Sequence, residues 1–247
     1  MVLVGAGNRI RLRVEQSREQ DRAARRQRCG EVGRQLDQWP GENIGADEVE
    51  RGAGLEHRRI QALGNREGKG PGGIFIMDHE SFDVRGQWEM DRGPQHLAYD
   101  AWWHLGHDTM VTSEWGTPDT FESGLIPEVL PGAKYGRHLH FWDLHKRKHL
   151  QTIDFGDKHQ LVFELRPAHD PTKAYGFVNC VISLEILSSS IWTWYRDGNK
   201  WAVKKVIEIP AEPADPADLP PLLQGFKAGP PLITDINLPL DDRQLHV

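Results

Sequence analysis

The stretch from His96 to Gly156 decides the fold: residues 96–115 read HLAYDAWWHLGHDTMVTSEW and residues 135–156 read YGRHLHFWDLHKRKHLQTIDFG. Aromatic and β-branched residues predict four strands, at 97–103, 109–115, 138–144 and 150–155. Gly106-His107-Asp108 supplies the first turn, and the polar residues 145–149 supply the last. Four antiparallel strands in about 60 residues have the size of one β-propeller blade, for which roughly 40 to 50 residues are usual.

The same plan recurs on both sides of this stretch. Upstream, GIFIMD (73–78) and FDVRGQWE (82–89) resemble the second hairpin of a blade, with a bulge expected near Gly86. Downstream, residues 161–182 and 188–210 predict two hairpins, the second turning at Asp197-Gly198-Asn199. After a Pro-rich connection, LITDINLPLDDRQLHV (232–247) predicts a last hairpin. The predicted fold class is all-β: a partial propeller with about two complete four-stranded blades and flanking hairpins.

The chain divides into two kinds of polypeptide. Residues 1–70 contain one aromatic residue, Trp39, with 14 Lys or Arg against 11 Asp or Glu, although the whole 247-residue chain has a net charge of −6. Residues 1–59 form a low-complexity Arg-rich segment without apolar periodicity, which predicts disorder or translation outside the native reading frame. Residues 60–247 are the expected partial propeller, and 60–73 (IQALGNREGKGPGG) is expected to be a loop.

Charge and cysteine content exclude several classes of function. The acidic body argues against nucleic-acid binding, because it repels phosphates on average. Two cysteines, Cys29 and Cys180, cannot make a disulfide framework, and Cys180 lies in an apolar run where a buried free thiol is expected. No stretch has the roughly 18 apolar residues of a membrane span, and no secretory signal peptide is present, so a cytoplasmic location is expected.

Histidines are the candidate metal ligands. His138 and His140 share one face of a predicted strand, where they form either a metal pair or a packed pair, and His104 and His107 flank a turn. The histidines of the polar turn, His145 and His149, are expected to be solvated.

Three further residues are candidates for a site. His169, in RPAHDPT, either stabilises a turn or serves a site, with Asp170 as the residue that would orient it. Asp100 and Asp235 occupy like places on innermost strands, where they line a central channel or cap turns. No Gly-rich phosphate loop opens a helix and no Ser-His-Asp set stands out, so the sequence assigns no catalytic or cofactor-binding residue.

The longer motifs resemble one known family. GPGGIFIMDHESFDVRGQWE, TSEWGTP, YGRHLHFWDL, ELRPAHDPTKAYGFV and PPLITDINL are similar to the selenium-binding protein family, whose bacterial members include methanethiol oxidases. The resemblance covers residues 60–243 and leaves residues 1–59 unmatched. It implies a seven-bladed propeller and a copper-dependent oxidase that converts methanethiol, oxygen and water to formaldehyde, hydrogen sulfide and hydrogen peroxide.

The resemblance also sets expectations for this chain. The family's histidine-rich segments are absent from it, so the resemblance implies that copper is not tightly bound and that the chain alone is inactive. His169 matches the family pattern and is the one metal candidate that the resemblance supports. Selenium is a second possible ligand, again without tight binding, because Cys180 matches no family cysteine clearly. A small thiol is the implied substrate, and the open blade edges predict self-association. The alternatives are a non-catalytic binding module or a truncated gene product.

Overall fold

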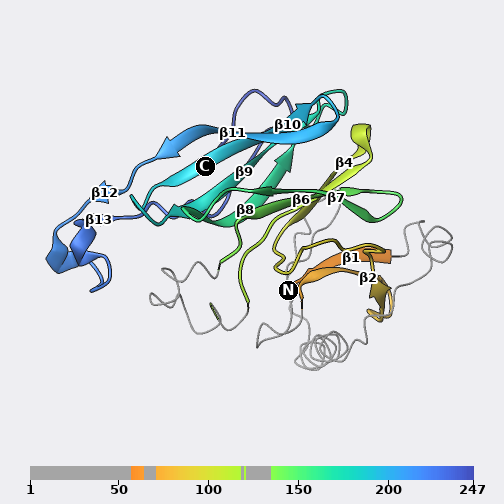
Figure 1. The fold of residues 1–247 in the computed structure, drawn as a ribbon, viewed down its shortest axis with the longest axis horizontal. Helices are drawn as coiled ribbons and strands as arrows, with labels where there is room; N and C mark the ends of the chain where they lie inside the picture. The colour runs from red at the N-terminus through yellow and green to blue at the C-terminus, as the bar shows by residue number, and fades with distance from the viewer. Residues whose placement is uncertain (1–56, 64–70, 118–119, 121–134) are drawn as a thin grey trace, which may run out of the picture.

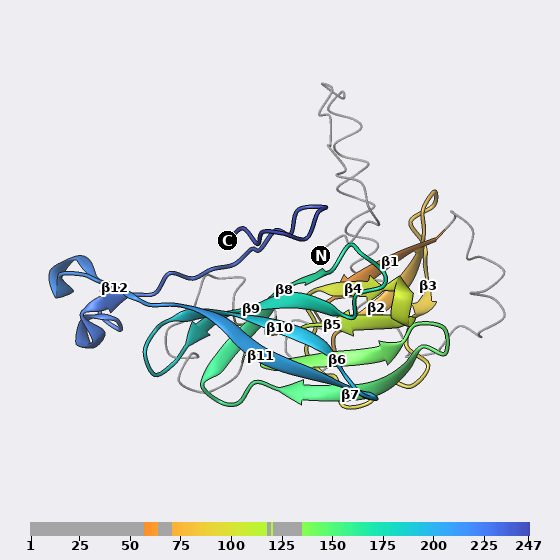
Figure 2. The same ribbon diagram turned by 90° about the horizontal axis from the view of Figure 1, so that it is seen from above.

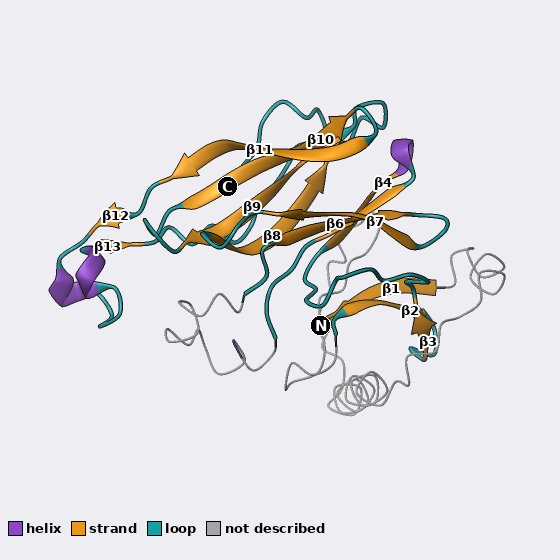
Figure 3. Cartoon of the chain, viewed as in Figure 1, coloured by secondary structure: helices purple, strands orange, loops and turns teal. Residues whose placement is uncertain are grey.

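The computed structural model describes residues 57–63, 71–117, 120 and 135–247, which form antiparallel β-sheet with short 3₁₀ turns and no α-helix among them (Figures 1 and 3). The predicted all-β class is therefore confirmed. The strands are β1 (His57–Ala62), β2 (Gly73–Asp78), β3 (Val84–Gln87), β4 (Ala101–His104), β5 (Thr109–Thr112), β6 (His138–Asp143), β7 (Lys148–Asp154), β8 (His159–Pro167), β9 (Tyr175–Ser183), β10 (Ser189–Asp197), β11 (Lys200–Ile209), β12 (Glu212–Pro213) and β13 (Ala228–Gly229). The 3₁₀ turns are η1 (Leu105–His107), η4 (Pro216–Asp218) and η5 (Gln224–Phe226).

Two four-stranded sheets contain most of the strand residues of the described chain. Their strand orders are β4-β5-β6-β7 and β11-β10-β9-β8, so each sheet follows chain order from one edge to the other. The four strands predicted in residues 96–156 are confirmed, although β4 starts only at Ala101 and β5 ends at Thr112. At the first turn Asp108 adopts a left-handed backbone with φ of 47°, which Asp tolerates better than most residues.

The first sheet has three strands in the order β1-β2-β3. Strand β1 pairs with β2 from His57↔Asp78 to Ala62↔Gly73, so the prediction of a loop at residues 60–73 is wrong for Ile60–Ala62. The polar sequence HRRIQA hid this strand, because β-propensity rests on aromatic and branched side chains. The predicted bulge is confirmed: Ile76 pairs with Gly86, and Met77 pairs with Val84. The expectations for residues 1–56, including Cys29, lie outside the described residues.

After β11 the chain leaves the sheets, forms the small β12–β13 pair, and returns (Figure 1). Seen from above, the C-terminal segment runs alongside β8 (Figure 2). It is held there by side chains, for example by the Asn179 amide, which donates to the Ile233 carbonyl at 2.6 Å. The hairpin predicted for 232–247 is reduced to a single bridge between Asn237 and His246. Pro239 lies between the two arms and cannot donate to a ladder, which limits pairing there.

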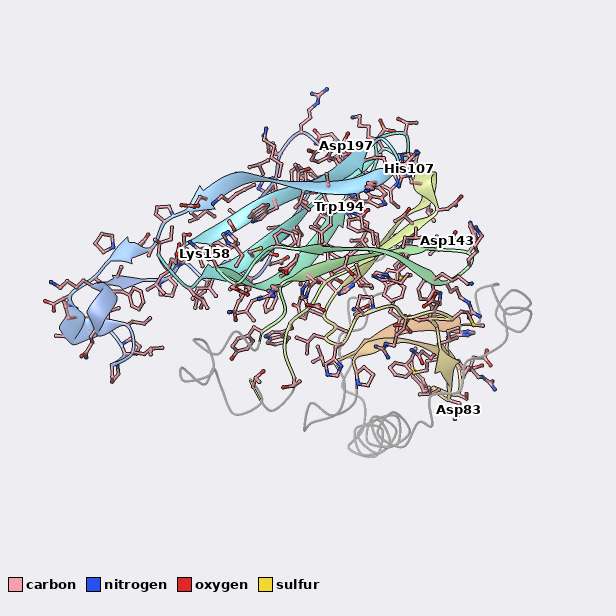
Figure 4. All side chains as sticks on the ribbon, in the orientation of Figure 1. Asp83, His107, Asp143, Lys158, Trp194 and Asp197 are labelled. Carbon is pink, nitrogen blue, oxygen red and sulfur yellow. The ribbon has the colours of Figure 1, made fainter. Side chains whose placement is uncertain are left out.

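The cores lie between successive sheets. Trp88 and Trp142 are fully buried and meet edge to face at 6.2 Å between the first and second sheets. Between the second and third sheets, Trp194 is surrounded by the side chains that fill the space (Figure 4) and meets Phe141 at 6.1 Å. In a sheet protein tryptophans are expected first of all in the core between sheets, and the buried Trp88, Trp142 and Trp194 agree with this, whereas Trp192 is only partly buried. Edge-to-face aromatic pairs of this kind stabilise the contact beyond the area that they bury.

The two large sheets are also tied by polar contacts at their outer strands. The Gln151 side chain, on β7, donates to the Trp201 carbonyl at 2.7 Å and accepts from the Trp201 backbone N–H at 2.9 Å. These contacts imitate one rung of a ladder between β7 and β11. They fix the sheets relative to each other, so the space between their inner strands has a defined shape.

Candidate functional site

A cavity of about 470 Å³ opens between the inner strands of the two four-stranded sheets. Indole, proline and aliphatic side chains make most of its wall, and two histidines and an arginine supply its polar groups. The lining residues come from the end of β4, from η1, and from β8 with the loop after it: Trp102, Trp103, His104, Leu105, Arg166, Pro167, Ala168, His169 and Pro171. A mostly apolar cavity with a few polar groups is the usual form of a small-molecule site.

Arg166 brings together the two aspartates that the sequence singled out. Its Nη2 donates to the Asp235 carboxylate at 3.0 Å, and its Nη1 lies 3.8 Å from the Asp100 carboxylate and donates to Glu164 at 2.8 Å. The guanidinium also lies 5.5 Å from the ring centre of Trp102, within the range of a cation–π contact. Three carboxylates thus surround the one guanidinium that reaches the cavity wall.

Asp100 and Asp235 differ in environment although they share Arg166. Asp235 is exposed, while Asp100 is buried and accepts from the Leu165 backbone N–H at 2.9 Å. Burial, and then the negative charge of Glu164, raise the pKa of Asp100 to about 7, against the smaller opposing effects of Leu165 and Arg166. Asp100, the residue before β4, therefore joins this end of the strand to β8. That Asp100 lines a central channel stays a prediction.

His169 lies at the cavity, and an aspartate other than the expected one orients it. Its Nδ1 is 2.8 Å from Oδ1 of Asp242, and its backbone N–H also donates to that carboxylate. Burial would raise the pKa of Asp242, but the hydrogen bonds from His169 lower it. Asp170, the orienting residue suggested by the sequence, instead accepts from the Thr172 hydroxyl and backbone N–H. A carboxylate only accepts, so the neutral His169 ring carries its proton on Nδ1 and a lone pair on Nε2.

His104 is the second imidazole of the cavity wall, and it is buried. Its Nε2 is 2.6 Å from the Lys173 carbonyl oxygen, which requires the ring to donate from that nitrogen. Its Nδ1 has no hydrogen-bond partner among the residues that the structure describes. His107, the other histidine at this turn, packs edge to face on Trp201 at 6.2 Å and lies near the β10–β11 turn at Asp197 (Figure 4).

A second polar group, formed by Glu114, His138 and His140, could hold a metal ion. Their ligand atoms all lie within 4.8 Å of one another. Oε2 of Glu114 is 2.6 Å from Nδ1 of His138, and Oε1 is 3.0 Å from Nε2 of His140. His138 and His140 lie two residues apart on β6, so their side chains share one face of the strand. Glu114 follows β5 and forms an isolated bridge with Val162 of β8. Sequence reasoning found the histidine pair and missed Glu114.

Electrostatics within this group favour an ionised carboxylate. Burial would raise the pKa of Glu114, but hydrogen bonds from His138 and His140 lower it to about 2. The hydrogen bond to Glu114 correspondingly raises the pKa of His138. Burial lowers the pKa of the neighbouring His149 to about 4, and the charge of His140 acts in the same direction.

The remaining expectations from the sequence have different outcomes. His145 is exposed and contacts Asp108 at 3.0 Å, in agreement with a solvated turn histidine. The same prediction is wrong for His149, which folds inward until its Nε2 lies 3.2 Å from Nδ1 of His140. Cys180 is fully buried, and burial raises the pKa of its thiol, which agrees with the expected buried free thiol. In the part of the chain that the structure describes, no helix is long and apolar enough to cross a membrane.

The fold and the two polar groups define the class: an all-β protein of repeated antiparallel sheets, with an apolar cavity and a carboxylate–histidine group between neighbouring sheets. The sequence profile of the 56kDa selenium binding protein (SBP56) family matches residues 54–247. The chain belongs to this family, as the motifs led us to expect.

Curated relatives and a solved structure agree with this assignment. Proteins named methanethiol oxidase from Rattus norvegicus and Homo sapiens are 38% and 37% identical to this chain over 188 residues, which are 76% of the chain and 37% of each relative. The chain thus spans little more than a third of the length of these relatives. The X-ray structure of a hypothetical selenium-binding protein from Sulfolobus tokodaii matches with a TM-score of 0.72 and 53% identity, over 78% of this chain and 42% of that one.

Proposed function

We propose that the three successive sheets are consecutive blades of a β-propeller and that the protein is a thiol oxidase of the methanethiol oxidase kind. The propeller is supported by the strand order within the two large sheets and by the aromatic cores between neighbouring sheets. The observation that carries the activity is the 36–38% identity to proteins named methanethiol oxidase. In the proposed reaction, methanethiol, oxygen and water give formaldehyde, hydrogen sulfide and hydrogen peroxide.

The cavity between β4 and β8 is the proposed thiol site. Trp102 and Trp103 offer apolar surface for an alkyl group, and His169 offers a base beside it. Because Asp242 holds the Nδ1 proton of His169, the Nε2 lone pair of that ring is free to accept the proton of a thiol S–H group. The thiolate formed in this way is the more readily oxidised species.

Copper is implied by the family, and the cavity alone does not fit it. His169 offers one imidazole nitrogen, and the other cavity imidazole, His104, is turned to the Lys173 carbonyl. A protein copper site needs several nitrogen or sulfur ligands. We therefore assign His169 to proton transfer, with a metal contact of its Nε2 as the alternative role. We propose that these 247 residues alone hold no copper ion in the thiol cavity and for that reason do not complete the oxidation. Selenium attachment at Cys180 is equally disfavoured, because that thiol is fully buried.

Self-association is the proposed behaviour of the open sheet edges. Strand β11 is the last strand of its sheet and exposes Val206 and Ile207, at 45% and 42% of their surfaces. Exposed apolar side chains on an edge strand favour pairing with another edge. Sedimentation velocity is expected to show oligomers that dissociate in a Val206→Lys and Ile207→Lys variant, and a purely monomeric wild type would contradict the proposal.

Thiol binding and turnover test the proposed function separately. With the full chain, broadening of the methanethiol methyl resonance in ¹H NMR is expected, and it should weaken in His169→Ala. The matched control is His145→Ala, which also removes an exposed imidazole held by an aspartate but lies outside the cavity wall. Absence of broadening by the wild type would refute the thiol site and favour a non-catalytic binding module. Hydrogen peroxide released by the copper-treated chain would refute the proposal that these residues alone are inactive.

A further inference from the structure

We propose that Glu114, His138 and His140 form a binding site for a first-row divalent ion of the Zn²⁺ type, separate from the thiol cavity. The three ligand atoms come from two neighbouring strand segments, so the fold sets their positions before any ion arrives. His138 and His140 are two residues apart on β6 and reach the same carboxylate. Neither histidine lines the cavity at Arg166.

The donor set determines the kind of ion. Two imidazole nitrogens and one carboxylate oxygen suit Zn²⁺ or Cu²⁺, whereas Mg²⁺ and Ca²⁺ prefer oxygen ligands alone. Ligands of a tetrahedral ion bound at about 2.0 Å lie roughly 3.3 Å apart. The three donor atoms all lie within 4.8 Å of one another, so each pair would need to close by at most about 1.5 Å. An ion would replace the imidazole protons that now point at Glu114.

The ring nitrogen of each histidine that faces away from Glu114 has a polar neighbour, as in established metal sites. Metal-bound histidines usually have the other ring nitrogen fixed by a second polar group. Nε2 of His138 lies 3.7 Å from the Asp154 carboxylate, and Nδ1 of His140 lies 3.2 Å from both His149 and the Thr152 hydroxyl. The contacts at Nδ1 orient the His140 ring toward Glu114, and the Asp154 carboxylate lies close enough to attract a proton on Nε2 of His138.

The three proposed ligands differ in burial, which would leave a bound ion one coordination position open to solvent. The side chains of Glu114 and His140 are 5% and 2% exposed, while that of His138 is 30% exposed. Water and the ion can therefore approach from the His138 side. The carboxylate is also fixed by the backbone N–H groups of Arg137 and His138, at 3.3 and 3.2 Å, and these bonds can persist when an ion displaces the imidazole protons.

The test is a titration of the full chain, stripped with a chelator, with ZnCl₂ in a calorimeter. The wild type is expected to show a tight site that weakens at least tenfold in His138→Ala and in Glu114→Gln, since even changes around metal ligands weaken binding by about 10- to 100-fold. His145→Ala is the matched control, because it removes an exposed imidazole from the turn between β6 and β7, and it should leave the tight site unchanged.

Coordination and folding provide the deciding measurements. Co²⁺ in place of zinc should give visible absorption of a low-symmetry site in the wild type and lose it in His138→Ala. Circular dichroism must show that the variant is folded; His138 is the most exposed ligand, so its replacement is the safest. Equal zinc affinity in the wild type and a folded His138→Ala, or no zinc binding at all, would overturn the proposal and leave a purely hydrogen-bonded cluster.

Discussion

Gly176 is the residue where a single methyl group should test the packing between the two large sheets. It lies on β9 directly opposite Trp194 of β10, in the register Trp194↔Gly176. A Cβ added there would overlap the Cζ2 and Cε2 atoms of Trp194 and would lie 2.7 Å from the Arg166 carbonyl oxygen. The glycine thus allows an indole ring to lie flat across the strand, a known arrangement in sheets.

The expected loss of stability in Gly176→Ala follows from these contacts. Overpacking typically costs about 1–3 kcal/mol, and here neither neighbour can move freely. Trp194 is fully buried, and its Nε1 donates to the Phe177 carbonyl at 3.2 Å. The Arg166 oxygen is a backbone carbonyl of β8, so it can move only if the strand moves. We therefore expect the free energy of unfolding to fall by about 3 kcal/mol, the upper end of the overpacking range. The loss should not exceed the roughly 3–5 kcal/mol that removal of a buried tryptophan side chain costs.

Urea denaturation followed by circular dichroism measures this loss, with a control and a double-mutant cycle. Gly225→Ala adds a Cβ that meets no atom within 4 Å, so it should change stability by less than about 0.5 kcal/mol. In a Trp194→Phe background the outer indole atoms are gone, and Gly176→Ala should cost at least about 1 kcal/mol less than in the wild type. A Gly176→Ala variant as stable as Gly225→Ala, or strict additivity in the cycle, would refute the reasoning.

Two further predictions concern buried titratable groups. The pKa of Asp100 in the folded protein, about 7, lies above the ordinary aspartate value of 3.8. The folded state therefore binds an extra proton between these values, and stability should fall as the pH rises from about 4 to 7. Asp100→Asn should flatten that part of the profile, measured as urea midpoints at pH 5 and 7.5; an unchanged slope would contradict it. The Cys180 thiol, with its pKa raised by burial, should react with a disulfide reagent in a Cys29→Ser chain only when the protein is unfolded by guanidinium, and rapid labelling of the native chain would disprove this.

The strands were predictable wherever aromatic or branched residues recur, because these residues fill the space between sheets. GIFIMD (73–78) and HLHFWD (138–143) coincide with β2 and β6. Strand β1 was missed because His57–Ala62 is mostly polar, and its pairing with β2 depends on a neighbour rather than on its own composition. The prediction of a last hairpin was wrong for the opposite reason: residues 232–247 have the composition of strands but form only one bridge.

The candidate sites were predictable residue by residue but not as assemblies. Asp100, Asp235 and His169 were named from local patterns, whereas the residue that joins the two aspartates, Arg166, is 69 positions from Asp235 in the chain. Asp242 is 73 positions from His169, and no short spacing connects them. Glu114 carried one weak signal: a charged residue between Ser113 and Trp115 at the end of a predicted strand must find a partner if it is buried.

Strand β8 explains why both polar groups lie at the same boundary between sheets. Its pairing with β9 is irregular between Val162 and Leu165, which frees backbone groups that a regular ladder would use. The Leu165 N–H then donates to Asp100, and the Phe163 carbonyl accepts from Ser113, so the preceding sheet satisfies them. Val162 itself bridges to Glu114. Irregularities of this kind often lie next to functional sites because they redirect side chains and backbone groups. Here one irregular strand holds Glu114 at the proposed metal site and carries Arg166 into the proposed thiol cavity, so a change that regularised β8 would be expected to disturb both.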